Sequence, residues 1–204
     1  MSRKEYWDNI YQDKGSGNVS WYQKEPSVSL RLIESIKLEA DDNIIDVGGG
    51  ASVLIDCLIK RGFKNVTILD ISSKALAIAE ERLVEDSRLV NWVVSDVTKY
   101  IPTEKYSLWH DRAAFHFLTK KEDRKKYRSE LENFVRLGGY VIISSFSVDG
   151  PTKCSGLDVL QYDSKKIKNE IGPQFSLVDE DSEIHITPTG VEQIFNYFVF
   201  KKIA

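Results

Sequence analysis

The feature that most constrains the fold is the stretch NIIDVGGGASVL at residues 43–54. An apolar run carries Asp46 near its end, three consecutive glycines follow, and residues typical of a helix then resume. Glycine lets a backbone turn sharply and approach a ligand closely, and a helix that begins behind such a turn directs its amino terminus at that ligand. The stretch therefore predicts a strand, a ligand-binding turn and a helix. Taken alone, it is also compatible with a plain tight turn.

Segments typical of strands and helices alternate along the rest of the chain. We expect strands at 43–47, 65–72, 90–97, 106–113 and 138–147, and helices at 51–62, 73–86, 119–137 and 164–172. This alternation is typical of a parallel sheet with helices on both faces. The last strand segments, around 175–187 and 194–202, are separated only by TPTG and should form an antiparallel hairpin at the sheet edge. The predicted fold is an α/β, Rossmann-like seven-stranded sheet, mostly parallel, with an antiparallel C-terminal hairpin.

Composition limits the class of protein. A chain of 204 residues, 42% hydrophobic, suits one compact domain over residues 1–204, and we expect a monomer or weak dimer. A net charge of -3 gives no general attraction to nucleic acid or to a membrane surface, and no apolar run approaches the ~18–20 residues that span a bilayer. The mixed charge at the start does not resemble a secretion signal. Cys57 and Cys154 form neither a metal-type pair nor a disulfide framework, so we expect no metal and a cytoplasmic location.

Acidic residues end the first three predicted strands. Asp70 lies 24 residues after Asp46, close to the spacing at which an acid on the neighbouring strand binds both ribose hydroxyls of a nucleotide. Asp96 ends the third strand, within reach of an adenine amino group. A carboxylate directly beneath the glycine turn suits a cationic ligand better than a pyrophosphate. S-adenosylmethionine (SAM) is such a ligand, because it combines adenosine with a sulfonium and an α-ammonium group.

With these motifs in order, the chain resembles the class I SAM-dependent methyltransferases over nearly its whole length. DVGGGAS matches the glycine motif of that family, with Ser52 where a third glycine is common, and ILDIS and SDV match its ribose and adenine motifs. LWHDRAAFHFL corresponds to the segment beside the methyl group, and RLGGYVII to the turn before the fifth strand. The resemblance implies SAM as cofactor, S-adenosylhomocysteine as product, and a cofactor site formed by Asp46, Gly48, Gly49, Gly50, Asp70, Ile71, Ser95, Asp96 and Val97.

The amino-terminal region, residues 1–40, is rich in aromatic residues and is expected to form a helical lid. Tyr6 and Trp7 are equally compatible with a helix that packs on the sheet. Trp21 and Tyr22 lie in a polar loop, from which an aromatic ring can cover the cofactor or stack on a sulfonium. The pattern is similar to that of methyltransferase-like protein-lysine methyltransferases, and small-molecule methyltransferases carry similar lids. We place Trp21 and Tyr22 in the cofactor site.

The fourth strand should bring its last residues to the reaction, because ligands lie beyond the carboxyl ends of parallel strands. Asp111, His110 and His116 are the candidate bases for removing a proton from the acceptor. Register decides whether His110 points to the site, and a partly buried position at the start of a helix is the alternative for His116. The turn-rich loop 147–163 is expected to shape the acceptor pocket. Cys154 in that loop is expected to be an exposed or packed thiol rather than a nucleophile or a metal ligand.

The predicted function is methyl transfer from SAM to a small molecule, since so compact a chain has little docking surface to spare. A protein lysine is the nearest alternative, through the amino-terminal pattern. An NAD(P)-dependent oxidoreductase shares the glycine turn and ribose acid but would need a substrate domain. A non-catalytic SAM-binding module is a further alternative. The sequence leaves open whether the acceptor atom is nitrogen, oxygen or sulfur.

Overall fold

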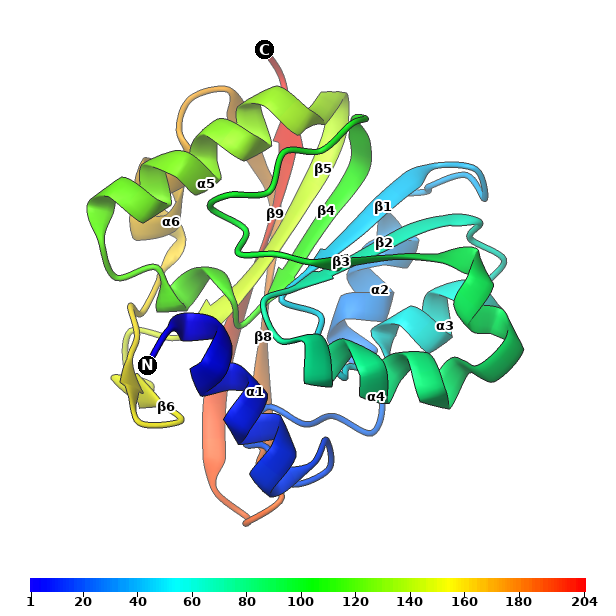
Figure 1. Cartoon of the computed structure of the whole chain (residues 1–204). Coiled ribbons are helices and arrows are strands. Elements are labelled where there is room, and N and C mark those ends of the chain that lie inside the picture. The colour runs from blue at the N-terminus through cyan, green and yellow to red at the C-terminus, as the bar shows by residue number, and fades with distance from the viewer.

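The computed structural model describes residues 1–204 and is built around a seven-stranded sheet in the order β3-β2-β1-β4-β5-β9-β8 (Figure 1). Neighbours among β1 to β5 pair in parallel, whereas β9 runs antiparallel to both β5 and β8. This arrangement confirms the predicted fold. The strands are β1 (Asn43–Val47), β2 (Asn65–Asp70), β3 (Val90–Val94), β4 (Tyr106–Arg112), β5 (Val135–Phe146), β8 (Phe175–Ile186) and β9 (Glu192–Lys202).

Helices cover both faces of the sheet. They are α1 (Arg3–Lys14), α2 (Ser27–Ser35), α3 (Leu54–Lys60), α4 (Ser73–Leu83), α5 (Lys121–Phe134) and α6 (Ser164–Ile171), with short 3-10 helices η1 (Val84–Leu89) and η2 (Phe115–Phe117). Local signals set several of their starts: Ser72 and Asp163 accept hydrogen bonds from backbone N–H groups in the first turns of α4 and α6. None of these helices combines the length and apolar character that crossing a membrane requires.

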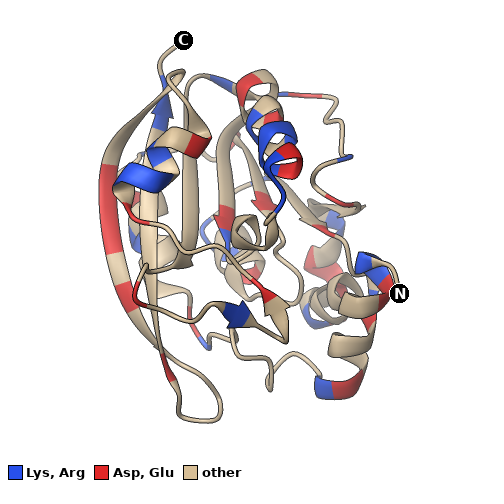
Figure 2. Ribbon diagram, turned by 90° about the vertical axis from the view of Figure 1, so that its left-hand side faces the viewer, with Lys and Arg blue, Asp and Glu red and all other residues tan.

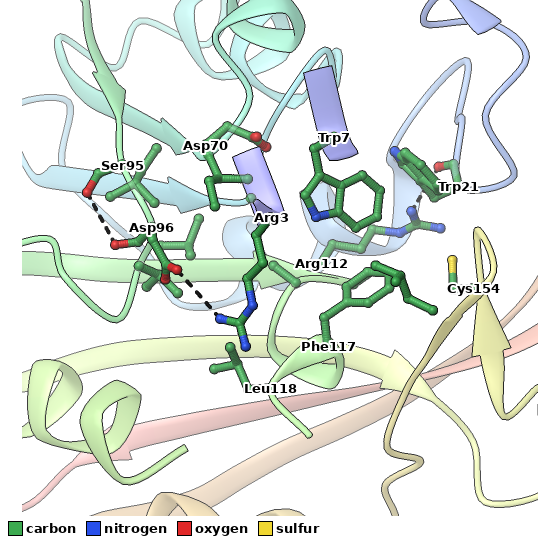
Figure 3. A pocket seen from close by; sticks show the side chains of 18 of the residues that line it. Arg3, Trp7, Trp21, Asp70, Ser95, Asp96, Arg112, Phe117, Leu118 and Cys154 are labelled. Carbon is green, nitrogen blue, oxygen red and sulfur yellow. Dashed lines mark hydrogen bonds and ion pairs between the residues drawn. The ribbon is translucent and has the colours of Figure 1, made fainter. Parts of the chain in front are cut away.

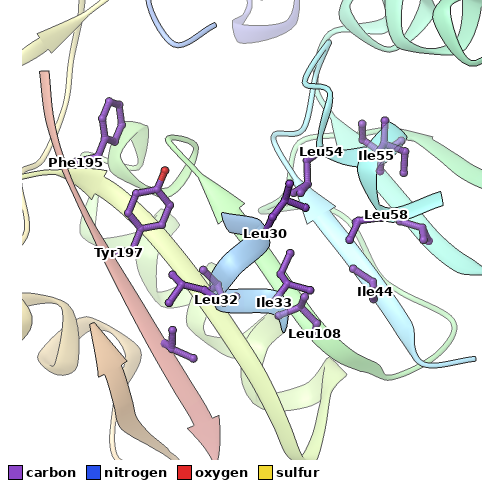
Figure 4. Close-up of a cluster of buried hydrophobic side chains, with 14 of the residues drawn as sticks. Leu30, Leu32, Ile33, Ile44, Leu54, Ile55, Leu58, Leu108, Phe195 and Tyr197 are labelled. Carbon is purple, nitrogen blue, oxygen red and sulfur yellow. The ribbon is translucent and has the colours of Figure 1, made fainter. Parts of the chain in front are cut away.

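Two hydrophobic cores lie on opposite faces of the sheet. On one face α2 and α3 pack on side chains such as Ile44 and Leu108 (Figure 4). On the other face α5 and α6 pack on side chains such as Ile45 and Trp109. Successive residues of a strand point to opposite faces, so each strand contributes alternate residues to each core. The same alternation fixes where the polar residues at the strand ends point.

The structure differs from the sequence prediction at some element ends. The helix expected at 119–137 ends at Phe134, because Val135 already pairs with Tyr106 and begins β5. The second strand ends at Asp70, whose Oδ1 accepts a hydrogen bond from Ser72 N and turns the chain. The loop 147–163 contains a small antiparallel hairpin that was not expected, formed by β6 (Lys153–Cys154) and β7 (Leu157–Asp158).

The free edge of the sheet is strongly acidic. Figure 2 shows red segments along the outer strand, which correspond to β8. Charged side chains on an edge strand oppose pairing with another chain, since its unpaired backbone groups would otherwise act as a template. The acidic residues of β8 are Asp179, Glu180, Asp181 and Glu183.

Arg82 of α4 holds the turn that follows β1. Its guanidinium donates to both oxygens of Asp56 at 2.7–3.2 Å, to Ala51 O at 3.0 Å and to Ser52 O at 2.7 Å. The two carbonyl oxygens belong to the residues just after the glycines. Arg82 therefore links α4 to the segment on which the cofactor site depends.

We expect Arg82→Met to lower the free energy of unfolding by about 1–3 kcal/mol, because several acceptors lose a charged donor at once. Urea unfolding followed by circular dichroism measures this difference. Arg88→Met is the matched control, because Arg88 is exposed and has no hydrogen bond or ion pair. Equal stability of the two variants would contradict the role given to Arg82.

Candidate cofactor and acceptor site

A cavity of about 380 Å³ lies at the carboxyl ends of the parallel strands. Val47, Asp70, Ser95 and Arg112, which end or follow β1, β2, β3 and β4, all line it. Its volume falls within the ~300–1,000 Å³ range of small-molecule sites. Figure 3 shows Asp70, Ser95, Asp96 and Arg3 at one side of the cavity, and Trp7, Trp21, Phe117 and Cys154 at the other.

The first side has the character of a nucleoside site. Asp70 is buried, and its Oδ1 accepts from Ser72 N at 2.7 Å. Burial raises the pKa of Asp70 to about 7, against the lowering effect of its backbone hydrogen bonds. Ile71, Ser95, Asp96 and Val97 line the same side. The structure thus brings Asp70 together with the residues predicted to hold the nucleoside.

Each glycine of the turn has a close neighbour where a side chain would begin. Gly48 has φ +66°, and its N–H donates to Leu69 O at 2.7 Å. A Cβ at Gly48 would collide with Ala114, one at Gly49 would lie 2.5 Å from Asp46 Oδ2, and one at Gly50 would lie 2.6 Å from the Tyr11 hydroxyl. The three glycines therefore bring this backbone into contact with its surroundings where no side chain fits.

A smaller cavity of about 50 Å³ lies against the same turn, lined by Asp46, Gly48, Gly49, Trp21 and Tyr22 among others. Gly48 and Trp21 line both cavities, so the two are neighbours. Asp46 Oδ1 lies 2.7 Å from His110 Nδ1, while Asp46 Oδ2 is buried without a hydrogen-bond partner. A ligand with a cationic end beside a nucleoside fits this pair of carboxylates, Asp46 and Asp70.

Helix α1 forms the roof of the larger cavity. Arg3, Trp7 and Tyr11 all line the cavity, and they recur every fourth residue, which places them on one face of the helix. Arg3 forms ion pairs with Asp123 at 2.7 Å and Asp96 at 3.5 Å, which fix the start of α1 over the cavity. Sequence reasoning missed Arg3 and Tyr11, although their spacing from Trp7 was a usable signal.

The second side of the cavity is mainly aromatic and apolar. The ring of Trp7 meets those of Trp21 and Phe117 edge to face, with centroids 5.6 and 5.0 Å apart. Cys154 and Leu157 of the small hairpin complete this side. Burial raises the pKa of the Cys154 thiol, which is the behaviour of a packed cysteine. Trp21 lines the cavity as predicted, whereas Tyr22 is half exposed and lines only the smaller cavity.

None of the three candidate bases lines the larger cavity. Asp111 is buried on the α5 face of the sheet, and accepts from Ala114 N at 2.9 Å, Phe115 N at 3.0 Å and the Tyr127 hydroxyl at 2.8 Å. Burial raises the pKa of Asp111 to about 6. Its hydrogen bonds hold the chain that follows β4, against which Gly48 packs. This placement does not suit direct proton transfer from an acceptor.

The two histidines are also withdrawn from the larger cavity. His110 lies between Asp46 and Ser29 on the opposite face from Asp111, and both of its ring nitrogens are within hydrogen-bond distance of a partner. His116 is buried against Phe117 and Phe146, and neither of its ring nitrogens has a partner. Burial lowers the pKa of His116 to about 3, so its imidazole is neutral. A catalytic role for these residues stays a prediction that this geometry does not favour.

Residues 45–143 match a family model described as a methyltransferase domain. Mouse EEF1A lysine methyltransferase 2 is 25% identical over 193 residues, covering 86% of this chain and 77% of that protein. Malonyl-acyl-carrier-protein O-methyltransferase 1 of Ilyobacter polytropus is 33% identical over 106 residues, covering 51% of this chain and 38% of that protein. Haemonchus contortus phosphoethanolamine N-methyltransferase 2, solved with phosphomonomethylethanolamine and S-adenosylhomocysteine, superposes with a TM-score of 0.79 at 15% identity, covering 100% of this chain and 61% of that one.

The raised pKa of Asp70 predicts a stability cost that grows with pH. Between pH 4 and pH 7 the unfolded chain has released this proton while the folded chain retains it, so stability falls as pH rises through that window. Asp70→Asn removes this cost. The stability gained by the variant over the wild type should be about 2–3 kcal/mol larger at pH 8 than at pH 5.

Urea unfolding of both proteins at the two pH values, without added ligand, measures this difference. Asp13→Asn changes an exposed carboxylate outside both cavities and serves as the control. A gain for Asp70→Asn that is the same at both pH values would show that Asp70 is already ionised in the folded chain at pH 5.

Proposed function

We propose that this chain, which is a class I SAM-dependent methyltransferase, transfers the methyl group of its cofactor SAM to a small molecule. The observation that supports the proposal is the limited volume of the site, which α1 and the small hairpin partly cover. The cavity of about 380 Å³ offers room for the nucleoside and the acceptor, and the smaller cavity of about 50 Å³ beside it borders the place of the amino-acid end. The larger volume is at the low end of the ~300–1,000 Å³ range of small-molecule sites. The nucleoside would take part of this volume, and the remainder suits a small acceptor.

We assign cofactor binding to one side of the cavity and acceptor binding to the other. Asp70 would accept hydrogen bonds from the ribose hydroxyls, and Ile71 and Val97 would enclose the adenine. Asp46 would face the cationic amino-acid end from beneath the glycine turn. The acceptor would then lie among Trp7, Phe117 and Leu157, in surroundings that favour an apolar body.

When bound, SAM supplies a methyl group on a positively charged sulfur. The chain contributes position and exclusion of water: α1 and the small hairpin close over the acceptor side, and the segment fixed by Asp111 forms its floor. Aromatic rings at this side suit a neighbouring positive charge. Asp158, a carboxylate at this side, is exposed and pairs with Lys153 at 3.7 Å. We therefore favour an acceptor that is already nucleophilic near neutral pH, such as a thiolate or a weakly basic amine that is unprotonated there.

A protein lysine is the second candidate acceptor, because mouse EEF1A lysine methyltransferase 2 is similar over most of both chains. The aromatic side of the cavity would suit an alkyl amine as well. A lysine on a protein would have to enter past α1 and the small hairpin. The two candidate acceptors therefore differ in whether α1 and the small hairpin have to move.

Incubation with methyl-labelled SAM and a cell extract, followed by separation by size, tests the proposal. We expect label in the small-molecule fraction, and none with Asp70→Ala, in which the ribose acceptor is missing. Label in a protein band that is lost with the same variant would instead establish a protein acceptor. Label in neither fraction, across extracts of different growth conditions, would contradict both.

Narrowing the acceptor side should separate acceptor use from cofactor binding. Leu157→Trp adds bulk at β7, beside Cys154, and we expect it to lower kcat/KM for the acceptor at least tenfold while the Kd of SAM changes less than twofold. Leu137→Trp is the control, since Leu137 is exposed near the amino end of β5, away from the cavity. A parallel loss of SAM affinity in Leu157→Trp would show that this side holds the cofactor instead. Calorimetry and steady-state assays measure both quantities.

A further inference from the structure

We infer that His110 is a positioning residue for cofactor binding, which acts through Asp46 on the cationic amino-acid end of SAM. Ser29 completes the arrangement from the other side of the imidazole. The inference rests on SAM as the cofactor and is independent of the acceptor proposed above.

The sheet places Asp46 and His110 side by side. They are direct partners in the parallel register of β1 and β4, and both side chains point to the face covered by α2. His110 Nδ1 lies 2.7 Å from Asp46 Oδ1, and His110 Nε2 lies 2.9 Å from Ser29 Oγ of α2. All three residues are at least 98% buried. Their hydrogen bonds are therefore made without competition from water.

The geometry lets His110 hold one oxygen of Asp46. In one tautomer the imidazole donates from Nδ1 to Asp46 Oδ1 and accepts the Ser29 hydroxyl proton at Nε2. One oxygen of the Asp46 carboxylate is thereby held in place. Its other oxygen, Oδ2, is buried and has no hydrogen-bond partner. An unsatisfied buried acceptor is unfavourable for the free chain, and a cationic ligand nearby offsets this cost.

The unpartnered oxygen of Asp46 lies where the amino-acid end of SAM would be. A Cβ at Gly49 would lie 2.5 Å from Asp46 Oδ2, so this oxygen lies directly against the glycine turn. Ser29, Asp46 and His110 line the smaller cavity together with Gly48, which also lines the larger one. Asp70 lines only the larger cavity, together with the residues assigned to the nucleoside. Loss of His110 should therefore affect one end of the ligand and spare the other.

Two ligands that differ at that end provide the test. S-adenosylhomocysteine carries the amino-acid end, whereas 5′-methylthioadenosine has the same nucleoside and sulfur without it. We expect His110→Leu to weaken S-adenosylhomocysteine at least tenfold in calorimetry and to change the Kd of 5′-methylthioadenosine less than twofold. Asp46→Asn should show the same selectivity.

A conservative variant separates positioning from packing. His110→Asn keeps an N–H donor near the position of Nδ1, so it should recover most of the affinity for S-adenosylhomocysteine that His110→Leu loses. Weakening of both ligands alike, or of neither, would overturn the inference. Should His110→Leu fail to fold, Ser29→Ala takes its place, with an expected loss of twofold to fivefold for S-adenosylhomocysteine alone. An equal loss for both ligands, or none, would again overturn it.

Discussion

The parallel pairing of β1 with β4 is the constraint on which the rest of the site depends. It sets Asp46 opposite His110 and Val47 opposite Asp111, at the edge where the cavities open. Because neighbouring strand residues point to opposite faces, His110 joins the face covered by α2 and α3, and Asp111 joins the face covered by α5. A shift of one residue would exchange the two, and would put a carboxylate beside Asp46 in place of its imidazole partner. Like charges so close and so deeply buried would be strongly unfavourable.

The three buried acids at this edge differ in how far the protein satisfies them. Asp111 accepts from two backbone N–H groups and from Tyr127, and its role within the structure is thereby accounted for. Asp70 accepts from Ser72 N and faces the cavity. Asp46 has one oxygen held by His110 and one without a partner. Incomplete hydrogen bonding is unfavourable for a buried carboxylate. A carboxylate that lacks partners therefore indicates a position where a ligand supplies the missing groups. By this measure we assign Asp46 and Asp70 to ligand binding, and Asp111 to holding the chain that follows β4.

The sequence predicted what is encoded by neighbouring residues. The glycine turn, the acids that end successive strands and the closing hairpin are local patterns. They were sufficient for the fold, and for expecting Asp70, Ser95 and Asp96 at one edge of the sheet, where they line the cavity. The partners of Asp111 and His110 were not predictable in the same way. Tyr127 and Ser29 come from α5 and α2, and their contacts depend on strand register and helix packing, which no single segment determines. The sequence predicted part of the placement of Arg3, Trp7 and Tyr11. Their spacing indicates one helix face, but only the packing of α1 shows that this face covers the cavity.

Enclosure links the cofactor site to the choice of acceptor. The residues that cover the acceptor side come from α1 and the small hairpin, which the chain contributes from its beginning and from the segment after β5. Arg3 fixes the start of α1 to Asp96, beside the nucleoside, so the roof of the acceptor side is anchored at the cofactor side. A ligand that orders the adenine region would therefore also hold the roof in place. Such coupling would suit the proposed small acceptor, which could be held beneath α1 and the small hairpin without displacing them.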